Sequence, residues 1–352
     1  MRSDTRVPLG RIGAGLAVKD ELDIDVQHAQ SLVAADVAGI RVQESVELVP
    51  ASAVLSLEPL PLMPAAPSIG GATRDPTSPP HRARKNWGDP VANRVMETTN
   101  SALNNRVALV TGGGRGIGQA ISLGLAELGA RVAVLARSAD QVRETAARIT
   151  SSGGQALALP ADVGDPDQVA AALDTIAQRW GEIQLLVNNA AVVWPLGPSA
   201  TIDASQWATA IAINVTAAAR LTFTVLPGML AQDWGRIVNV SSGIAASPAA
   251  MLRANAYATS KAALEAHTLN LAAELAGTGV TVNVYRPGGV DTAMQAWIRK
   301  QDPEQIGATL HQRFTDNYQQ GTLLTPAQSA VALLTRLASR ATGQIWDVSD
   351  RQ

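Results

Sequence analysis

The chain has 352 residues, enough for one large domain or two modest ones. Its 28 basic and 30 acidic residues leave a formal net charge of −2, which gives no support for nucleic-acid binding through a basic face. Because the chain has no Cys and only four scattered His residues, disulfides and thiolate chemistry are excluded and a metal site is not expected.

The N-terminal region, residues 1–103, differs in composition from the rest of the chain. Its first hundred residues hold ten of the nineteen prolines, with clusters at 58–67 and 76–90. Proline disrupts helices and central strands, so we interpret this region as a Pro-rich, largely disordered extension. Two alternatives stay open, namely a small accessory module and a functional chain that begins at Met96.

Neither a membrane anchor nor a secretory signal is expected. The sequence has no run of 18 or more apolar residues, the length that a spanning helix needs. The first twenty residues carry a short, Gly-broken apolar stretch with acidic residues soon after it, which is untypical of a signal peptide. The expected location is therefore the cytoplasm.

From residue 104 to residue 352, apolar runs alternate with Ala-rich helical patterns. Continuous apolar strands separated by helices predict a seven-stranded parallel sheet, doubly wound, with helices on both faces. Its binding crevice should lie at the carboxyl ends of the strands. We place strands at 106–111, 131–136, 155–160, 183–188, 236–241, 280–285 and 343–348, and helices at 118–129, 140–153, 166–181, 203–232 and 256–276.

The first strand runs directly into TGGGRGIG, residues 111–118, which opens the first helix. Glycines let a backbone turn sharply and approach a pyrophosphate closely, and a helix N-terminus supplies free N–H groups. A tight turn alone would use similar residues, but the position between strand and helix favours a dinucleotide site.

The end of the second strand bears on the choice of nicotinamide cofactor. An acidic residue there would bind a ribose 2′-hydroxyl, but Ala136 occupies the position and Arg137 follows it. Arg115 projects from the glycine loop, and two guanidinium groups can pair with a 2′-phosphate. We therefore favour NADP (NADPH) over NAD, the alternative being that the arginines are solvated surface residues.

Six motifs occur in order along the chain, namely TGGGRGIG, NNAA at 188–191, Asn214, VNVSS at 238–242, YATSK at 257–261 and RPGGVDT at 286–292. With these motifs the chain resembles the short-chain dehydrogenase/reductase family, in its T-G-x-x-x-G-x-G branch, and is most similar in type to 3-oxoacyl-ACP reductases. The resemblance covers about residues 104–349 and implies a Rossmann fold and NAD(P)-dependent oxidation and reduction.

The resemblance implies a catalytic tetrad of Asn214, Ser242, Tyr257 and Lys261. Residues four apart on a helix share a face, so Lys261 should stand near the Tyr257 phenol and lower its pKa toward a useful acid/base range. Ser242, at the end of a strand, would donate to the substrate oxygen. By resemblance only, Lys261 also holds the nicotinamide ribose and Asn214 positions a water that relays protons.

Cofactor contacts follow from the positions of the motifs at the ends of the strands. We predict that the cofactor is bound by Thr111, Gly112, Gly114, Arg115, Gly116, Ile117, Gly118, Arg137, Asp162, Val163, Asn189, Ala190, Tyr257, Lys261, Pro287, Gly288, Val290 and Thr292.

Residues 293–322 lie where relatives carry a mobile substrate lid. We predict an apolar substrate pocket formed by Trp194, Met251, Met294 and Trp297, although a role in the core or an interface is an equally open interpretation. The predicted function is NADP-dependent hydride transfer to a carbonyl, or from a secondary alcohol, as in 3-oxoacyl-thioester reduction. The alternative is a catalytically silent nucleotide-binding scaffold or sensor. Relatives suggest a homodimer or homotetramer, with no nucleic-acid or membrane partner.

Overall fold

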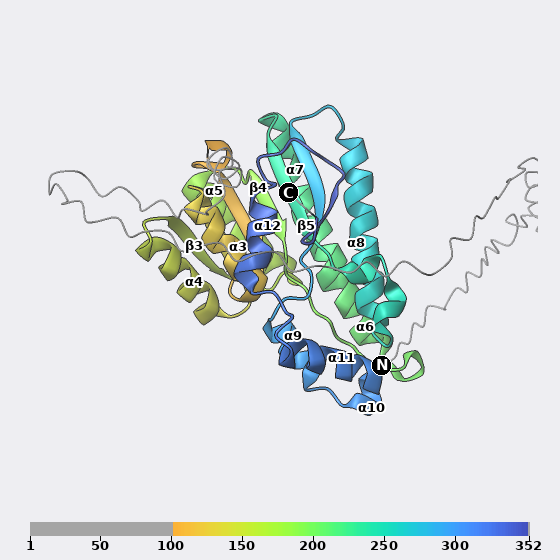
Figure 1. Ribbon diagram of the computed structural model, residues 1–352. Helices are drawn as coiled ribbons and strands as arrows, with labels where there is room; N and C mark the ends of the chain where they lie inside the picture. Colours follow the sequence, from red (N-terminus) through yellow and green to blue (C-terminus); the bar gives the residue numbers. More distant parts are fainter. Residues whose placement is uncertain (1–100, 351–352) are drawn as a thin grey trace, which may run out of the picture. The chain divides into compact units, whose positions relative to one another are not determined.

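In the computed structural model, residues 101–350 are described, and Figure 1 shows their ribbon. Seven strands pair in parallel in the order β3-β2-β1-β4-β5-β6-β7, which confirms the predicted sheet. The sequence order reverses between β1 and β4, the place where such sheets open a ligand crevice. The strands are β1 (Val107–Thr111), β2 (Arg131–Ala136), β3 (Gln155–Pro160), β4 (Leu185–Asn188), β5 (Gly235–Val240), β6 (Val280–Arg286) and β7 (Ile345–Asp347).

Helices cover both faces of the sheet because the strands are apolar on both faces. In β1, Val107 and Leu109 pack into one core and Ala108 and Val110 into the other. The first core includes α5 (Pro166–Trp180), α7 (Ala217–Ala231) and α8 (Asn255–Glu274). The second includes α3 (Gly116–Glu127), α4 (Ala139–Ser151) and α12 (Pro326–Leu334). These two layers can be followed in Figure 1.

The long helix predicted at 203–232 is not uniform. It consists of α6 (Ala204–Ile211), a π-helical segment η2 (Ala212–Thr216) and α7. Within the described residues, this 28-residue stretch is also the one helix long and apolar enough to cross a membrane, and 44% of its most apolar window is buried inside the protein. Length and composition alone are weak grounds for a membrane span, because buried core helices meet the same criterion.

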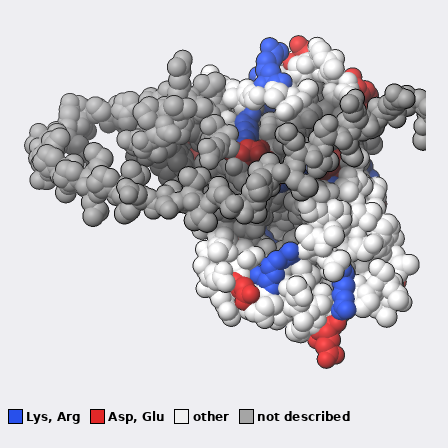
Figure 2. All heavy atoms as spheres, turned by 45° about the vertical axis from the view of Figure 1, so that its right-hand side comes forward, with Lys and Arg blue, Asp and Glu red and all other residues white. Residues whose placement is uncertain are grey.

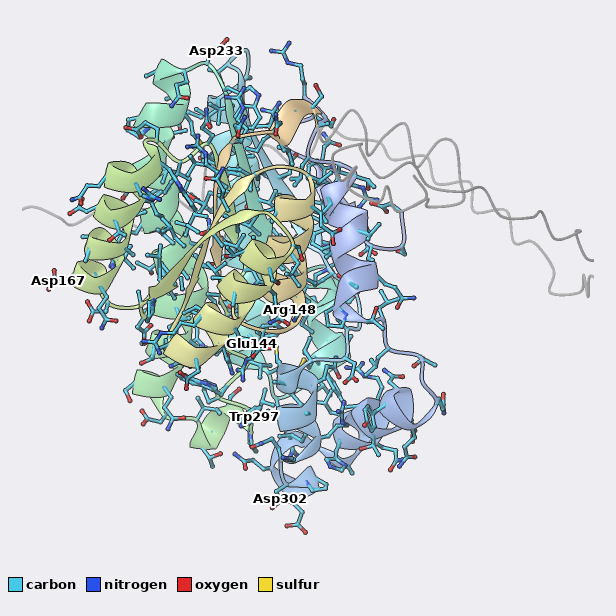
Figure 3. All side chains as sticks on the ribbon, turned by 90° about the vertical axis from the view of Figure 1, so that its left-hand side faces the viewer. Glu144, Arg148, Asp167, Asp233, Trp297 and Asp302 are labelled. Atoms are coloured by element: carbon cyan, nitrogen blue, oxygen red, sulfur yellow. The ribbon has the colours of Figure 1, made fainter. Side chains whose placement is uncertain are left out.

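Two short 3₁₀ helices, η3 (Gly243–Ala245) and η4 (Pro248–Met251), fill the segment between β5 and α8, and a third, η1 (Ser199–Thr201), precedes α6. After β6 the chain forms α9 (Ala293–Arg299), α10 (Pro303–Ile306) and α11 (Ala308–Gln319), which lie together at one end of the domain (Figure 1). We call these three helices the lid. In Figure 3, Asp302 points outward at its far end, and Trp297 lies nearer the sheet.

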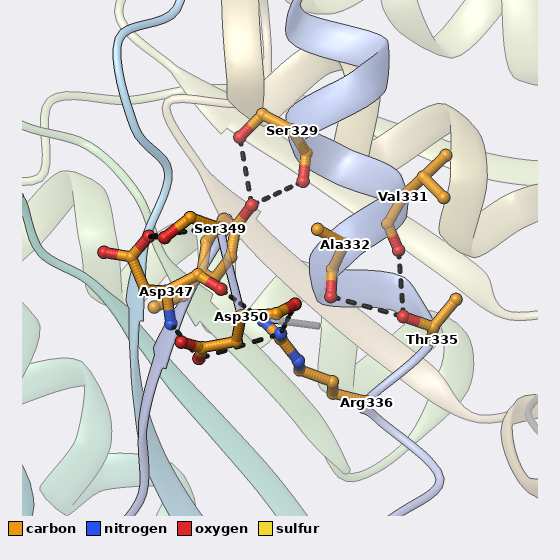
Figure 4. A network of polar contacts seen from close by, with 9 residues as sticks. Ser329, Val331, Ala332, Thr335, Arg336, Asp347, Ser349 and Asp350 are labelled. Atoms are coloured by element: carbon orange, nitrogen blue, oxygen red, sulfur yellow. Dashed lines mark hydrogen bonds and ion pairs between the residues drawn. The ribbon is translucent and has the colours of Figure 1, made fainter. Parts of the chain in front are cut away.

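The C-terminal end of the described chain is fixed by polar contacts, shown in Figure 4. Arg336, just after α12, donates to the Asp347 carbonyl oxygen of β7 at 2.9 Å and forms an ion pair with Asp350 at 3.7 Å. The Tyr285 hydroxyl of β6 donates to the Ser329 carbonyl oxygen of α12. Strand β7, predicted at 343–348, is therefore short but anchored to the edge of the sheet.

Residues 1–100 of the predicted extension, including the alternative start Met96, lie outside the described residues.

On the face shown in Figure 2, the described Lys and Arg side chains are scattered and alternate with Asp and Glu.

Candidate active site

A cavity of about 370 Å³ opens at the carboxyl ends of the strands, where the order of the sheet reverses. Most of the predicted cofactor residues line it, and Met294 of the lid does so too. The predicted residues in its wall are Gly112, Gly114, Arg115, Gly116, Ile117, Gly118, Arg137, Asp162, Val163, Asn189, Ala190, Tyr257, Lys261, Pro287 and Thr292.

The glycine loop has the geometry of a phosphate cradle. Gly112 and Gly116 have φ angles of +64° and +56°, a region that favours glycine. A Cβ on Gly118 would lie 2.3 Å from the Gly112 carbonyl oxygen, so the loop and α3 approach more closely than any side chain permits. The N-cap residue of α3, Arg115, makes no side-chain capping bond, which leaves the first N–H groups of a 12-residue helix available to an anion. The loop therefore fits a pyrophosphate.

Three predicted cofactor residues stand behind the cavity wall. The buried Thr111 hydroxyl accepts from the N–H groups of Asn189 and Ala190, both at 3.0 Å, and so joins the ends of β1 and β4. Gly288 has a φ angle of +76° and faces Val348, and Val290 is buried in a bridge to Leu324. These residues shape the wall without lining it.

The residues predicted to favour NADP over NAD lie at one end of the cavity. Arg115 is exposed, and the Arg137 side chain is 67% exposed. Arg137 lies 4.0 Å from the Asp162 carboxylate. Ser138 and Gln141, which were not predicted, line the same end, and the Ser138 hydroxyl caps α4 by accepting from the Gln141 N–H at 3.4 Å. Ser138 could have been predicted as a helix N-cap, because it is a polar residue just before a helical pattern.

Ser242 stands beside Tyr257, which lines the cavity. The Ser242 hydroxyl, just beyond β5, forms a side-chain hydrogen bond with the Tyr257 phenol and also accepts from the Ile244 N–H at 3.4 Å. The neighbouring hydroxyl, on Ser241, points elsewhere and donates to the Glu265 carboxylate at 2.7 Å. The cavity wall itself includes Tyr257 and Ser241 but not Ser242. Ser242 is thus joined to the site through the phenol.

Lys261 is buried, with 3% of its surface exposed, and lines the same cavity. Its ammonium donates to the Val240 carbonyl oxygen at 2.7 Å and stands 5.7 Å from the centre of the Tyr257 ring. Burial lowers its pKa from 10.5 to about 8, and the Glu265 carboxylate opposes this change. The group is still mostly cationic at neutral pH.

The prediction that the pKa of Tyr257 lies below its ordinary value is wrong. Burial raises the pKa of the phenol above its ordinary value of 10, and the hydrogen bond with Ser242 only partly offsets this effect. Desolvation penalises the charged phenolate, and the ammonium is committed to the Val240 carbonyl rather than to the phenolic oxygen. The phenol is therefore held in its protonated form.

Asn214 is buried inside the π-helical segment η2. Its amide oxygen accepts from the Val192 N–H at 2.8 Å, and its amide nitrogen donates to the Val192 carbonyl oxygen at 2.8 Å and to the Ser260 hydroxyl at 3.0 Å. Ser260 in turn donates to the Tyr257 carbonyl oxygen at 2.8 Å. The side chain predicted to position a water thus ties the loop after β4 to the helix turn that carries Tyr257.

The substrate pocket was predicted in the lid and in the segment before α8. Met251, Met294 and Trp297 belong to one apolar cluster together with Tyr257 and Phe314. Trp194 lies beside this cluster in sequence, between its members Val193 and Leu196, but is not part of it. Its role in a substrate pocket stays a prediction.

No role was predicted from the sequence for Glu265, which is buried, or for Arg286, whose side chain is 17% exposed; the two form a bidentate pair behind the site. The available signal was the spacing of Tyr257, Lys261 and Glu265 at i, i+4 and i+8 on one helix face. Across residues 101–350, no group of three or more His, Asp or Glu side chains is arranged to hold a metal ion.

Comparison with known proteins agrees with this geometry. The profile of the short chain dehydrogenase family matches residues 106–303. The chain is 38% identical over 193 residues to the 3-oxoacyl-(acyl-carrier-protein) reductase FabG of Pseudomonas aeruginosa, a match that covers 55% of this chain and 77% of the relative.

Solved structures show the same likeness. A variant of actinorhodin polyketide ketoreductase with NADPH matches with a TM-score of 0.62 and 32% identity, covering 69% of this chain and 95% of that chain. An NAD⁺-bound xylitol dehydrogenase matches with a TM-score of 0.62 and 26% identity, covering 70% of this chain and 98% of that chain. The family profile spans more than half of the chain, and the sheet and glycine loop have the family's arrangement. The protein therefore belongs to the short-chain dehydrogenase/reductase family of enzymes.

Proposed function

We propose that residues 104–352 form an NADP-dependent oxidoreductase domain that transfers a hydride between the nicotinamide and a carbonyl or secondary alcohol. The observation that carries this proposal is a single cavity lined by Tyr257, Lys261 and the glycine-rich phosphate cradle, with Ser242 beside the Tyr257 phenol. The reductases among the relatives, FabG and the actinorhodin ketoreductase, favour carbonyl reduction as the chemistry.

The residues that would hold the cofactor follow from the cavity wall. The backbone of Gly112–Gly118 would bind the pyrophosphate, and Asp162 and Val163 would face the adenine. Arg115 and Arg137 would pair with a 2′-phosphate, since no acidic residue stands at Ala136 to bind a free 2′-hydroxyl. This arrangement favours NADPH, although the similar xylitol dehydrogenase is bound to NAD⁺.

The nicotinamide, when bound, supplies or accepts the hydride. In the reducing direction, the protonated Tyr257 phenol gives its proton to the substrate oxygen, and the Ser242 hydroxyl donates a hydrogen bond to the same oxygen. The Lys261 ammonium stabilises the phenolate that remains, which burial alone would disfavour. Asn214 holds the helix turn of Tyr257 in place through Ser260.

The substrate proposed for this site is largely apolar, because Met294 lines the cavity and belongs to one apolar cluster with Met251, Trp297 and Tyr257. Thioesters of 3-oxo acids, the substrates named by the FabG relative, fall within this class.

We also propose that the chain assembles as a homodimer or homotetramer through α7 and α8. Phe223 and Leu230 on α7 are 58% and 41% exposed, and Leu269 on α8 is 38% exposed. Phe223 packs edge-on against His267 of α8, with 5.6 Å between the ring centres, so the two helices share one apolar face.

The cytoplasmic location stays a prediction.

The test is NADPH oxidation by the purified protein against ketones, aldehydes and 3-oxoacyl thioesters, with NADH in parallel. We expect turnover with NADPH, and near-complete loss of turnover in Tyr257→Phe with NADPH binding retained. The Tyr318→Phe variant, which changes an exposed tyrosine of the lid, is the matched control. Undiminished turnover in Tyr257→Phe would refute the mechanism, and a preference for NADH would refute the assignment of Arg115 and Arg137. A protein that binds NADPH and reduces none of these compounds would support the silent scaffold.

A further inference from the structure

Behind the proposed catalytic residues lies a buried acid that the mechanism above does not use. Glu265 follows Lys261 by one helix turn, as Lys261 follows Tyr257, so the phenol, the ammonium and the carboxylate form one stripe along α8. Only 10% of the Glu265 side chain is exposed. A carboxylate at such a depth is costly to bury unless it is paired.

The Glu265 carboxylate is fixed by partners on two strands. Arg286, the last residue of β6, donates through Nε at 2.9 Å and through Nη2 at 2.7 Å. The Ser241 hydroxyl, one residue beyond β5, donates to the same carboxylate at 2.7 Å. The three bonds join α8 to the ends of β5 and β6, next to Ser242 and to the loop that begins at Pro287.

We next compare the charged groups on the elements that pack against α8 near Lys261. Among the elements packed most closely on α8, namely α6, β5, β6 and η2 to η4, only β5 and β6 carry charged residues. Arg236 lies at the opposite end of β5, where it donates to the Gly279 and Leu337 carbonyl oxygens. The Tyr285 phenol of β6 is turned toward Ser329 in the other core. Arg286 is bound to Glu265 itself.

We propose that Glu265 is a positioning residue for the reaction: its carboxylate, fixed by Arg286 and Ser241, keeps Lys261 cationic beside the Tyr257 phenol. This inference rests on the proposed function, in which a charged Lys261 stabilises the phenolate. A carboxylate on the same helix face favours the ammonium form of Lys261, against the burial that disfavours it. The Glu265 carboxylate is bonded to Arg286 and the Lys261 ammonium to the Val240 carbonyl oxygen, so the carboxylate acts on the ammonium through its charge and not through a direct bond.

The experiment measures the protonation of Lys261 directly. The chain has only four lysines, Lys19, Lys85, Lys261 and Lys300, so ¹³C-lysine NMR of the full chain gives few signals, and Lys261→Met identifies the one of interest. In Glu265→Gln we expect the pKa of Lys261 to fall by about one pH unit. The matched control is Glu274→Gln, the same change at an exposed position of the same helix, which should leave this pKa unchanged.

A second pair of variants removes the unpaired guanidinium that Glu265→Gln leaves behind, and so serves if that variant does not fold. The pKa of Lys261 should be lower in Glu265→Gln/Arg286→Gln than in Arg286→Gln alone. The proposal would be overturned if the pKa of Lys261 were the same in the wild-type protein and Glu265→Gln, or the same in Arg286→Gln and the double variant. Glu265 would then have a structural role only.

The alkaline limb of kcat/KM for NADPH-dependent reduction gives an independent readout. In Glu265→Gln it should move to lower pH, while a purely structural defect would lower activity equally at every pH. Because the NMR titration needs no turnover, failure of the wild-type protein to reduce any carbonyl would refute the proposed function without deciding the role of Glu265.

Discussion

Adjacent hydroxyl groups at the end of β5 have different partners. Ser242 is bonded to the Tyr257 phenol, whereas Ser241 is bonded to Glu265 and so belongs to the support behind the site. The order of the two serines in the chain places one on each side of the strand end, since successive side chains alternate. This separation agrees with the assignment of Ser242 as the residue that contacts the substrate oxygen.

Replacing the two serines in turn tests this assignment. Ser242→Ala should lower kcat about 10²- to 10³-fold, because it removes a donor to the oxygen where charge develops. Ser241→Ala should lower kcat less than about tenfold, since it removes one of three bonds to Glu265. Steady-state kinetics with NADPH saturating compares them. The reverse order of effects would transfer the catalytic role to Ser241.

Among the helices and strands, the lid is hydrogen-bonded to the loop after β4 and to the segment after η4. The Gln305 side chain of α10 donates to the Leu196 carbonyl oxygen at 3.0 Å. Arg253, which follows η4, donates to the carbonyl oxygens of Glu304 and Gln305 at the C-terminal end of α10. A cation is favourable at a helix C-terminus, so this contact stabilises the attachment of the lid to the segment before α8. Arg253 also has a φ angle of +65°, unusual for a residue with a side chain.

Arg253→Ala should loosen the lid without unfolding the sheet. The side chain is exposed, so we expect a local loss of about 1 kcal/mol, which corresponds to about fivefold faster amide exchange in α10 and α11. Hydrogen–deuterium exchange with mass spectrometry measures this. Arg148→Ala, at an exposed position near the end of α4 (Figure 3), is the control and should leave the lid unchanged. Equal exchange in the two variants would show that Arg253 does not hold the lid.

For the whole molecule, the buried Lys261 makes stability depend on pH. Its pKa is about 8 in the folded protein and 10.5 ordinarily, so the unfolded chain binds more protons between these values. Stability therefore rises with pH across this window, because the cost of burying the cation disappears as it deprotonates. The slope is at most about 1.4 kcal/mol per pH unit.

Comparison with Lys261→Met isolates this effect. Between pH 8 and pH 10, the free energy of unfolding of the wild-type protein should rise by about 2 kcal/mol more than that of the variant. Urea denaturation at a series of pH values measures the difference, and contributions from other groups cancel between the two proteins. Parallel curves for the two proteins would mean that Lys261 has an ordinary pKa in the folded state.

Assembly is the second property of the whole molecule that a substitution tests. Phe223→Glu puts a charge in the centre of the apolar face on α7 and α8, so we expect the proposed dimer or tetramer to dissociate to monomers. Light scattering gives the mass. Leu252→Glu, at a residue 69% exposed outside both helices, is the control. A wild-type monomer, or a Phe223→Glu variant of undiminished mass, would contradict the proposed interface.

The sequence by itself determined the seven strands, the glycine loop and the positions of Tyr257, Lys261 and Ser242. These features are local: apolar runs specify buried strands, and glycine spacing specifies the turn between β1 and α3. The tertiary structure alone decided the raised pKa of Tyr257, the engagement of Asn214 with Val192, and the pairing of Glu265 with Arg286. Each of these features depends on burial or on contacts between residues far apart in the chain. Neither burial nor such contacts can be predicted from a short stretch of sequence.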